Sequence, residues 1–262
     1  MPESDDGFLS EPFDNVINTV RSKYVAQRTL LLRTNRFAVA IQHALVIHHG
    51  NNLEFYAAVL FARTLATVQG AALLLERGLV AQARTVLRMA LETLFKLGAI
   101  ANKPTLMDEL IEGVAFERKR LAKNMQLWKD PELRKVADAE AASGRLQPFL
   151  DSPASGVTTF ALAEAAGLED WYRSLYMLLS WSAHGAPKDL DRHVVVDSNQ
   201  NLIGFQNEPE LEKQYSSWFY SIEILLRALT ALGKIFPNVH EGQIEHYHVE
   251  LRALVQEQED KL

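Results

Sequence analysis

Three charged side chains follow one flank of an apolar helical pattern between Leu79 and Ala101. Arg84, Arg88 and Glu92 are spaced four residues apart, and on a helix such residues stack on the same side. At this spacing Arg88 and Glu92 can form an ion pair directly. Charges beside a core stripe are costly to bury without partners. The pattern therefore predicts either a functional site or a network of mutually satisfied charges.

A second polar file lies on the segment Leu168–His184, which is predicted to be an aromatic and leucine-rich helix. Arg173, Met177, Ser180 and His184 are spaced four, three and four residues apart, so an uninterrupted helix places them on one face. Arg173 is a candidate binding residue on this face. If the two helices are neighbours in one bundle, their polar files are expected to meet in one partly buried cluster.

The expected cluster contains side chains that could perform acid–base chemistry on a phosphate. Histidine titrates near neutral pH, so His184 is the candidate acid–base residue. Arg88, or Arg84 in its place, would stabilise negative charge on an oxyanion or phosphate. Glu92 would orient the arginine, and Ser180 would contact the same pocket. The catalytic candidates are therefore His184, Arg88 and Glu92.

The same residues have a structural interpretation. Buried charges in helix bundles commonly satisfy one another and fix the packing of the helices. A histidine in the last turn of a helix can bind the terminal carbonyls and is favoured by the helix dipole. Gly185 supplies the terminating conformation after His184, and Pro187 prevents continuation of the helix. A functional site requires that His184 is open to solvent and lies close to an arginine, whereas a structural network requires neither.

Two stretches resemble a bacterial family of uncharacterised helical proteins. They are GLVAQARTVLRMALE, residues 78–92, and YRSLYMLLSWSAH, residues 172–184. The resemblance covers about residues 51–236, and members of this family look like the HEPN group of helical bundles. Many HEPN proteins are metal-independent ribonucleases that act as dimers, often as toxins or in phage defence. The resemblance thus implies an RNA or nucleotide partner and a homodimer.

The HEPN signature is an arginine followed, four to six residues later, by a histidine on one late helix. This sequence departs from that pattern, because the arginine nearest before His184 is Arg173, eleven residues upstream. In this resemblance, an arginine of the 79–101 helix, Arg84 or Arg88, would have to take its place in space. The alternative function is a non-enzymatic helical scaffold or interaction module in which the Arg88, Glu92 and His184 cluster is structural.

The composition limits the other classes of function. The chain has 262 residues, no cysteine and a formal net charge of −6. An acidic chain lacks the basic field that broad nucleic-acid or anionic-membrane binding needs, and the absence of cysteine excludes disulfides and thiolate metal sites. The N-terminus has no apolar signal segment. Arg63 interrupts the most apolar run, so we expect no membrane span and a cytoplasmic protein.

Helical periodicity covers most of the chain. Helices are predicted over about 11–49 (one long or two broken), 53–77, 79–101, 105–128, 131–142, 159–166, 168–184, 209–236 and 237–260. In the 79–101 helix, the core stripe is predicted to be Ala83, Leu87, Ala90, Leu94 and Leu97. Two β-rich runs around a polar turn predict a hairpin at 193–205. The prediction is an all-α antiparallel bundle with one small β-hairpin, as one domain over 11–262 behind a flexible segment 1–10.

The remaining clusters of titratable residues are predicted to be solvated surface. They are His43, His48 and His49; His240, His246 and His248 with Glu241, Glu245 and Glu250; and Glu117, Arg118, Lys119, Arg120 and Lys123. The last group has a second interpretation as a local phosphate-contacting strip. No P-loop, GxGxxG, GxSxG or HExxH motif occurs, and no metal or cofactor is predicted.

Overall fold

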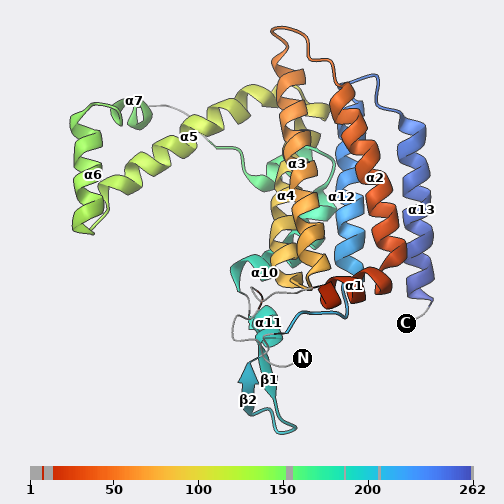
Figure 1. Ribbon diagram of the computed structural model, residues 1–262. Helices are drawn as coiled ribbons and strands as arrows, with labels where there is room; N and C mark the ends of the chain where they lie inside the picture. Colours follow the sequence, from red (N-terminus) through yellow and green to blue (C-terminus); the bar gives the residue numbers. More distant parts are fainter. Residues whose placement is uncertain (1–7, 9–13, 152–155, 186, 206–207, 261–262) are drawn as a thin grey trace.

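The computed structural model describes residues 8, 14–151, 156–185, 187–205 and 208–260, without the side chains of residues 188, 189 and 192. Its main body is a bundle of long helices that run up and down beside one another (Figure 1). They are α2 (Val25–Ala44), α3 (Asn52–Glu76), α4 (Val80–Asn102), α12 (Tyr215–Gly233) and α13 (Glu241–Glu259). The predicted all-α antiparallel bundle is confirmed. The predicted flexible segment 1–10 lies outside the described residues, apart from Phe8.

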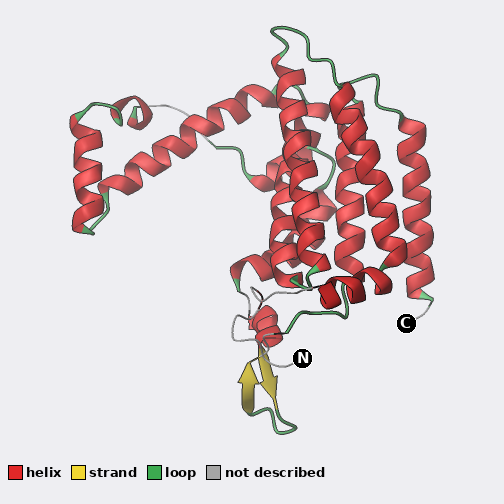
Figure 2. Cartoon of the chain, in the orientation of Figure 1, coloured by secondary structure: helices red, strands yellow, loops and turns green. Residues whose placement is uncertain are grey.

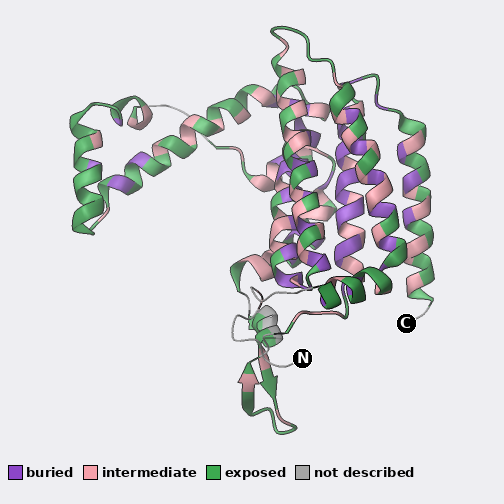
Figure 3. Ribbon diagram, viewed as in Figure 1, coloured by how far each residue is buried: buried purple, intermediate pink, exposed green. Residues whose placement is uncertain are grey.

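The core of the bundle is centred on α4. Its predicted stripe is confirmed, since Ala83, Leu87, Ala90, Leu94 and Leu97 are each 0% exposed. In Figure 3 the buried residues gather where α3, α4 and α12 face one another. The side chains of α12 that complete this core include Ile222, Leu225 and Leu229. Burial of these apolar faces provides the main driving force for the arrangement.

Within the described part of the chain, α3 is long and apolar enough to cross a membrane by length and composition. Core helices of soluble proteins pass the same test, and 39% of the most apolar window of α3 is buried inside the protein. In the structure α3 packs against α4 and α12. Here it is a core helix of the bundle.

The N-terminal helical pattern forms two helices, α1 (Asp14–Lys23) and α2, separated at Tyr24. Tyr24 is buried, and its hydroxyl bonds the segment before α12, donating to the carbonyl of Leu211 and accepting from the N–H of Gln214. The predicted end of α2 near residue 49 is wrong, because the chain is already extended at Leu45.

The predicted start of α12 at Pro209 is also wrong, since α12 begins at Tyr215. Tertiary contacts hold the preceding segment in another conformation. The N–H of Glu210 donates to the carbonyl of Gly78, and Lys213 has a left-handed φ of 58°. A left-handed residue cannot continue a right-handed helix.

A helical arm projects sideways from the bundle (Figures 1 and 3). It consists of α5 (Leu106–Gln126), α6 (Pro131–Ala142) and the short α7 (Gln147–Leu150). The arm has a small core of its own, formed by Ala122, Met125, Ala137 and Leu146. Its projection does not follow from the helical periodicity that predicted these helices.

The chain then returns along the bundle through several short helices. These are α8 (Thr159–Ala165), α9 (Glu169–Trp171), a π-helical turn (Tyr172–Tyr176), α10 (Met177–His184), α11 (Pro187–Leu190) and a 3-10 turn (Asp191–His193). The strands β1 (Val194–Val196) and β2 (Leu202–Phe205) follow as an antiparallel hairpin (Figure 2). The predicted hairpin is confirmed, and the Asp197 carboxylate holds its turn by accepting from the backbone N–H groups of Asn199 and Asn201.

Candidate functional site

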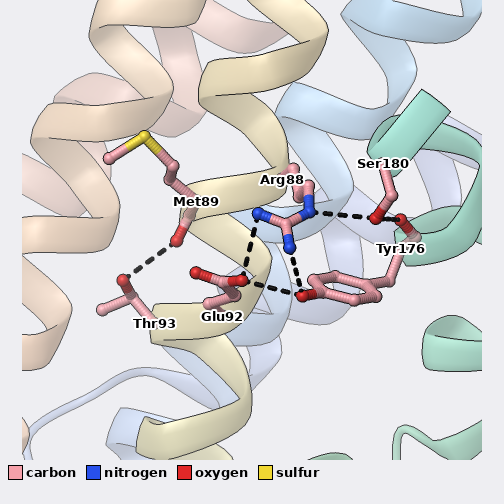
Figure 4. A network of polar contacts seen from close by, with 6 residues as sticks. All are labelled: Arg88, Met89, Glu92, Thr93, Tyr176 and Ser180. Atoms are coloured by element: carbon pink, nitrogen blue, oxygen red, sulfur yellow. Dashed lines mark hydrogen bonds and ion pairs between the residues drawn. The ribbon is translucent and has the colours of Figure 1, made fainter. Parts of the chain in front are cut away.

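The polar files of α4 and α10 meet through Arg88 (Figure 4). Its Nε donates to Ser180 Oγ at 2.9 Å, its Nη2 donates to the Tyr176 hydroxyl at 2.6 Å, and its Nη1 lies 3.2 Å from Glu92 Oε1. The Tyr176 hydroxyl in turn donates to Glu92 Oε1 at 2.8 Å. We call these four residues the Arg88 network. Each nitrogen of the guanidinium group therefore has a partner inside the fold.

The network fastens the return segment onto α4. Figure 4 shows the network on the side of α4 that faces α10, whereas Met89 and Thr93, which share a hydrogen bond of their own, point away from it. The guanidinium carbon of Arg88 also lies 4.7 Å from the centre of the Tyr176 ring, within the range of a cation–π contact. The side chains of Arg88 and Glu92 are only 19% and 34% exposed. Charge-assisted hydrogen bonds in such a setting are stronger than exposed ones.

Tyr176 is held in its neutral form within this network. Burial raises the pKa of Tyr176 to about 12, and the adjacent Glu92 carboxylate acts in the same direction. The neutral phenol donates its proton to the carboxylate while its oxygen accepts from Arg88. At physiological pH, Tyr176 is therefore a hydrogen-bond bridge and cannot act as a base.

The π-helical turn determines which side chains of the return segment face α4. A π turn inserts about one extra residue into the helical repeat and so rotates the residues on either side of it relative to each other. Ser180 follows the turn and faces Arg88. Arg173 lies within it and is instead bound to Glu169 at 2.7 Å, with its guanidinium 5.1 Å from the Phe160 ring. The predicted common face of Arg173 and Ser180 assumed an uninterrupted α-helix.

Arg84 takes part in a separate contact. Its Nε donates to Ser217 Oγ of α12 at 3.2 Å, and Ser217 is fully buried. The file of charges on α4 is therefore divided, with Arg84 directed to α12 and Arg88 to α10. Its members bind two different neighbours and do not form one pocket.

His184 is the predicted site residue that the structure leaves outside the network. It occupies the last position of α10, is exposed, and is followed by Gly185 with a left-handed φ of 60°. The N–H of Gly185 donates to the carbonyl of Trp181, which closes the helix. Among the described residues, no hydrogen bond or ion pair involves the side chain of His184. Of the four residues expected to cluster, Arg88, Glu92 and Ser180 come together.

Tyr176 is the member of the network that was not among the predicted site residues. Its spacing of four residues before Ser180 is a usable signal, since both then face the same neighbouring helix. The other predicted clusters remain on or near the surface. Arg120 pairs with Glu117, His246 pairs with Glu250, and His48 lies against Glu54. In the described part of the chain, no group of three metal-binding side chains converges.

Together, the fold and this site define an all-α bundle in which hydrogen bonds from a partly buried ion pair of the central helix, Arg88–Glu92, hold the return segment. Residues 54–202 match the model of a family described as "Family of unknown function (DUF5677)". The match spans more than half of the chain, so the protein belongs to this family. It includes both stretches that carry the resemblance, and the expected uncharacterised family is confirmed. Comparisons with curated proteins and with solved structures gave no significant match.

Proposed function

We propose that the protein is a non-enzymatic helical interaction module and that the Arg88 network is structural. The observation that carries this proposal is the pairing of every guanidinium nitrogen of Arg88 within the fold, while His184 stands outside. A catalytic arginine must offer donors to the substrate, whereas each of the three guanidinium nitrogens of Arg88 already contacts a neighbour within the fold. The protein is proposed to be bacterial, as the family resemblance implies, and cytoplasmic, as expected from the sequence pattern.

The partner that the surface of α10 supports is a second copy of the chain. Met177, Trp181 and His184 are spaced four and three residues apart, and all three are exposed. Met177 is 46% exposed and Trp181 is 44% exposed, which is unusual for large apolar side chains on one helix face. Aromatic residues and methionine are typical of interface centres. We therefore propose a homodimer in which this face of α10 packs against its equivalent.

The test compares two glutamate substitutions at exposed apolar positions. Trp181→Glu places a charge in the proposed interface, and Leu73→Glu places one on the surface of α3, where the side chain is 66% exposed. Sedimentation equilibrium should give a dimer for the wild type and for the Leu73 variant, and a monomer for the Trp181 variant. A monomeric wild type, or equal dissociation of both variants, would contradict the dimer.

A second candidate function rests on the same face. In a dimer formed through α10, His184 lies at the interface, where it could meet an arginine of the second copy. The HEPN-like proposal is that this arrangement cleaves RNA without metal, with His184 as the acid–base residue and Arg88 or Arg84 stabilising the phosphate charge. Its supporting observation is the exposure of His184 beside Trp181.

One assay separates the two functions. RNA cleavage in the presence of a metal chelator is measured for the wild type and for His184→Ala, together with the free energy of unfolding of both. For an interaction module we expect no cleavage and a change in stability below about 0.5 kcal/mol, because His184 is exposed. Cleavage by the wild type that disappears in a stably folded variant would establish the ribonuclease and refute the module.

A further inference from the structure

A groove on another side of the bundle joins a charged hollow to an apolar one. The charged hollow has a volume of about 620 Å³ and the apolar hollow about 710 Å³. Both are lined by α12 and α13 on one side and by the return segment around α8 to α10 on the other. Glu223 and Arg252 line both hollows, so the two are continuous. Each volume falls in the range of small-molecule sites.

The charged hollow carries an excess of positive charge on an acidic protein. Three permanent cations line it, Arg227, Lys234 and Arg252, against two carboxylates, Glu223 and Glu245. Each carboxylate is bound to an arginine, with Arg227 2.8 Å from Glu223 and Arg252 2.7 Å from Glu245. Lys234 instead donates to the side-chain oxygen of an asparagine at 2.7 Å. One positive charge in this hollow therefore lacks a carboxylate among the described residues.

Arg227 marks the boundary between the two hollows. Its guanidinium carbon lies 4.3 Å from the centre of the Trp171 ring, and Trp171 lines the apolar hollow. Stacking on the indole holds the guanidinium group flat and rigid. Its Nε is buried and has no hydrogen-bond partner among the described groups. Unlike Arg88, whose three guanidinium nitrogens each have a partner, this arginine has one nitrogen without a partner among the described residues.

Large apolar side chains form most of the second hollow. They are Trp171, Leu175, Leu178, Phe219, Tyr220 and Leu251. Among the residues that the structure describes, Glu223 and Arg252 at the shared boundary are the only charged ones that line this part. A ligand that extends from the charged hollow along this surface would bury an apolar chain at one end and a charge at the other.

We propose that this groove binds an amphipathic monocarboxylate, with its carboxylate at Arg227 and Lys234 and its apolar tail along Trp171 and Leu178. Counted without His248, which also lines the hollow and lies 3.3 Å from Glu223, three cations and two carboxylates leave a single positive charge. One monoanion neutralises this charge and a dianionic phosphate would exceed it. Arginine and lysine are the side chains that bind carboxylates in such sites. The apolar hollow accounts for the tail, because every buried methylene adds to affinity. The site uses none of Met177, Trp181 and His184, the residues of the proposed dimer face, so it stands independently of the proposed function.

The first test is isothermal titration of the full-length protein with decanoate, hexanoate and decyltrimethylammonium below their micelle concentrations. Decanoate should bind in a saturable manner. Decanoate has four more methylenes than hexanoate, and each raises affinity about fourfold when it is buried. Hexanoate should therefore bind up to about 250-fold more weakly, and at least about tenfold more weakly if only half of these methylenes are buried. Decyltrimethylammonium, the cationic amphiphile, should show no saturable binding. Absence of saturable binding by decanoate, or equal binding of the cationic amphiphile, would overturn the proposal.

Two pairs of variants locate the ligand within the groove. Lys234→Gln should weaken decanoate binding about fivefold through the loss of one cation, whereas Lys96→Gln, an exposed lysine on α4, should not change it. Leu178→Asn should weaken the binding of decanoate more than the binding of hexanoate, whereas Leu73→Asn on α3 should leave the binding of both unchanged. All four positions are exposed, so the variants should fold. Equal effects within either pair would show that decanoate binds elsewhere and would refute the site.

Discussion

The removal of a single hydroxyl group, in Tyr176→Phe, tests whether the Arg88 network stabilises the fold. The phenylalanine keeps the ring against Arg88, so only the hydrogen bonds to Arg88 and Glu92 are lost. Hydrogen bonds to charged groups contribute roughly 1.5–3 kcal/mol each. Water can partly replace the hydroxyl at these half-buried partners. We therefore expect the variant to lose about 1.5–3 kcal/mol of the free energy of unfolding at pH 8.

The pH dependence of this loss gives a sharper prediction. Tyr176 has a pKa of about 12 in the folded protein, against an ordinary value of 10.0. Because the folded state holds this proton more tightly, the contribution is fully present below pH 10 and is lost as pH rises toward 12. The difference corresponds to about 2.7 kcal/mol in total, of which about half, roughly 1.4 kcal/mol, should be lost by pH 11.

Urea denaturation of both proteins between pH 8 and pH 11, followed by circular dichroism, measures this effect. Other groups titrate in the same range, including Tyr24, whose pKa is also raised by burial. They are present in both proteins, so they cancel in the difference between the two free energies of unfolding. That difference should shrink by about 1.4 kcal/mol at pH 11. A difference that stays constant from pH 8 to pH 11 would refute the reasoning.

Two further predictions concern a buried carboxylate and a close helix contact elsewhere in the protein. Burial raises the pKa of Glu76, but hydrogen bonds from two arginines outweigh it and leave the pKa below 4.5. Glu76→Gln should lower the free energy of unfolding by about 2 kcal/mol at pH 7, measured by thermal denaturation. The difference between the wild type and the variant should disappear as pH falls below about 4, where Glu76 becomes protonated. Equal stability of the two proteins at pH 7 would show that the ion pairs of Glu76 do not stabilise the fold. Gly98→Ala should cost about 1–3 kcal/mol, because its Cβ would lie 2.8 Å from the Cβ of Ala166. In the control variant Gly113→Ala, on α5, the added Cβ has no atom within 4 Å, so the change should be neutral or stabilise the fold by up to about 1 kcal/mol. Equal effects of the two substitutions would refute the packing argument.

The helices and the buried stripe of α4 were predictable because they depend on local periodicity. The pairing of Arg88 with Glu92 was predictable for the same reason, since both lie on one helix. Ser180 was correctly placed beside them by its position on the neighbouring helix. These predictions needed only the repeat of an α-helix and the expectation that polar files meet.

The errors lie where the chain departs from regular helical spacing. The π turn separates the face of Arg173 from that of Ser180, and a prediction from uninterrupted α-helical spacing does not include it. The segment before α12 is held out of a helix by bonds to Tyr24 and Gly78. The groove brings together α4, α12, α13 and the return segment, and no spacing along the sequence indicates that arrangement.

The position of α10 connects the network to both proposed surfaces. One face of α10 binds Arg88 through Ser180, a second contributes Leu178 to the groove, and a third exposes Trp181. Three such contacts on a helix of two turns restrict its rotation, because a rotation by one residue, about 100°, would move all three side chains off their positions. The Arg88 network fixes that rotation with directional hydrogen bonds, which apolar packing alone does not supply. A partly buried ion pair retained for orientation explains why polar side chains occupy the boundary of an apolar core here.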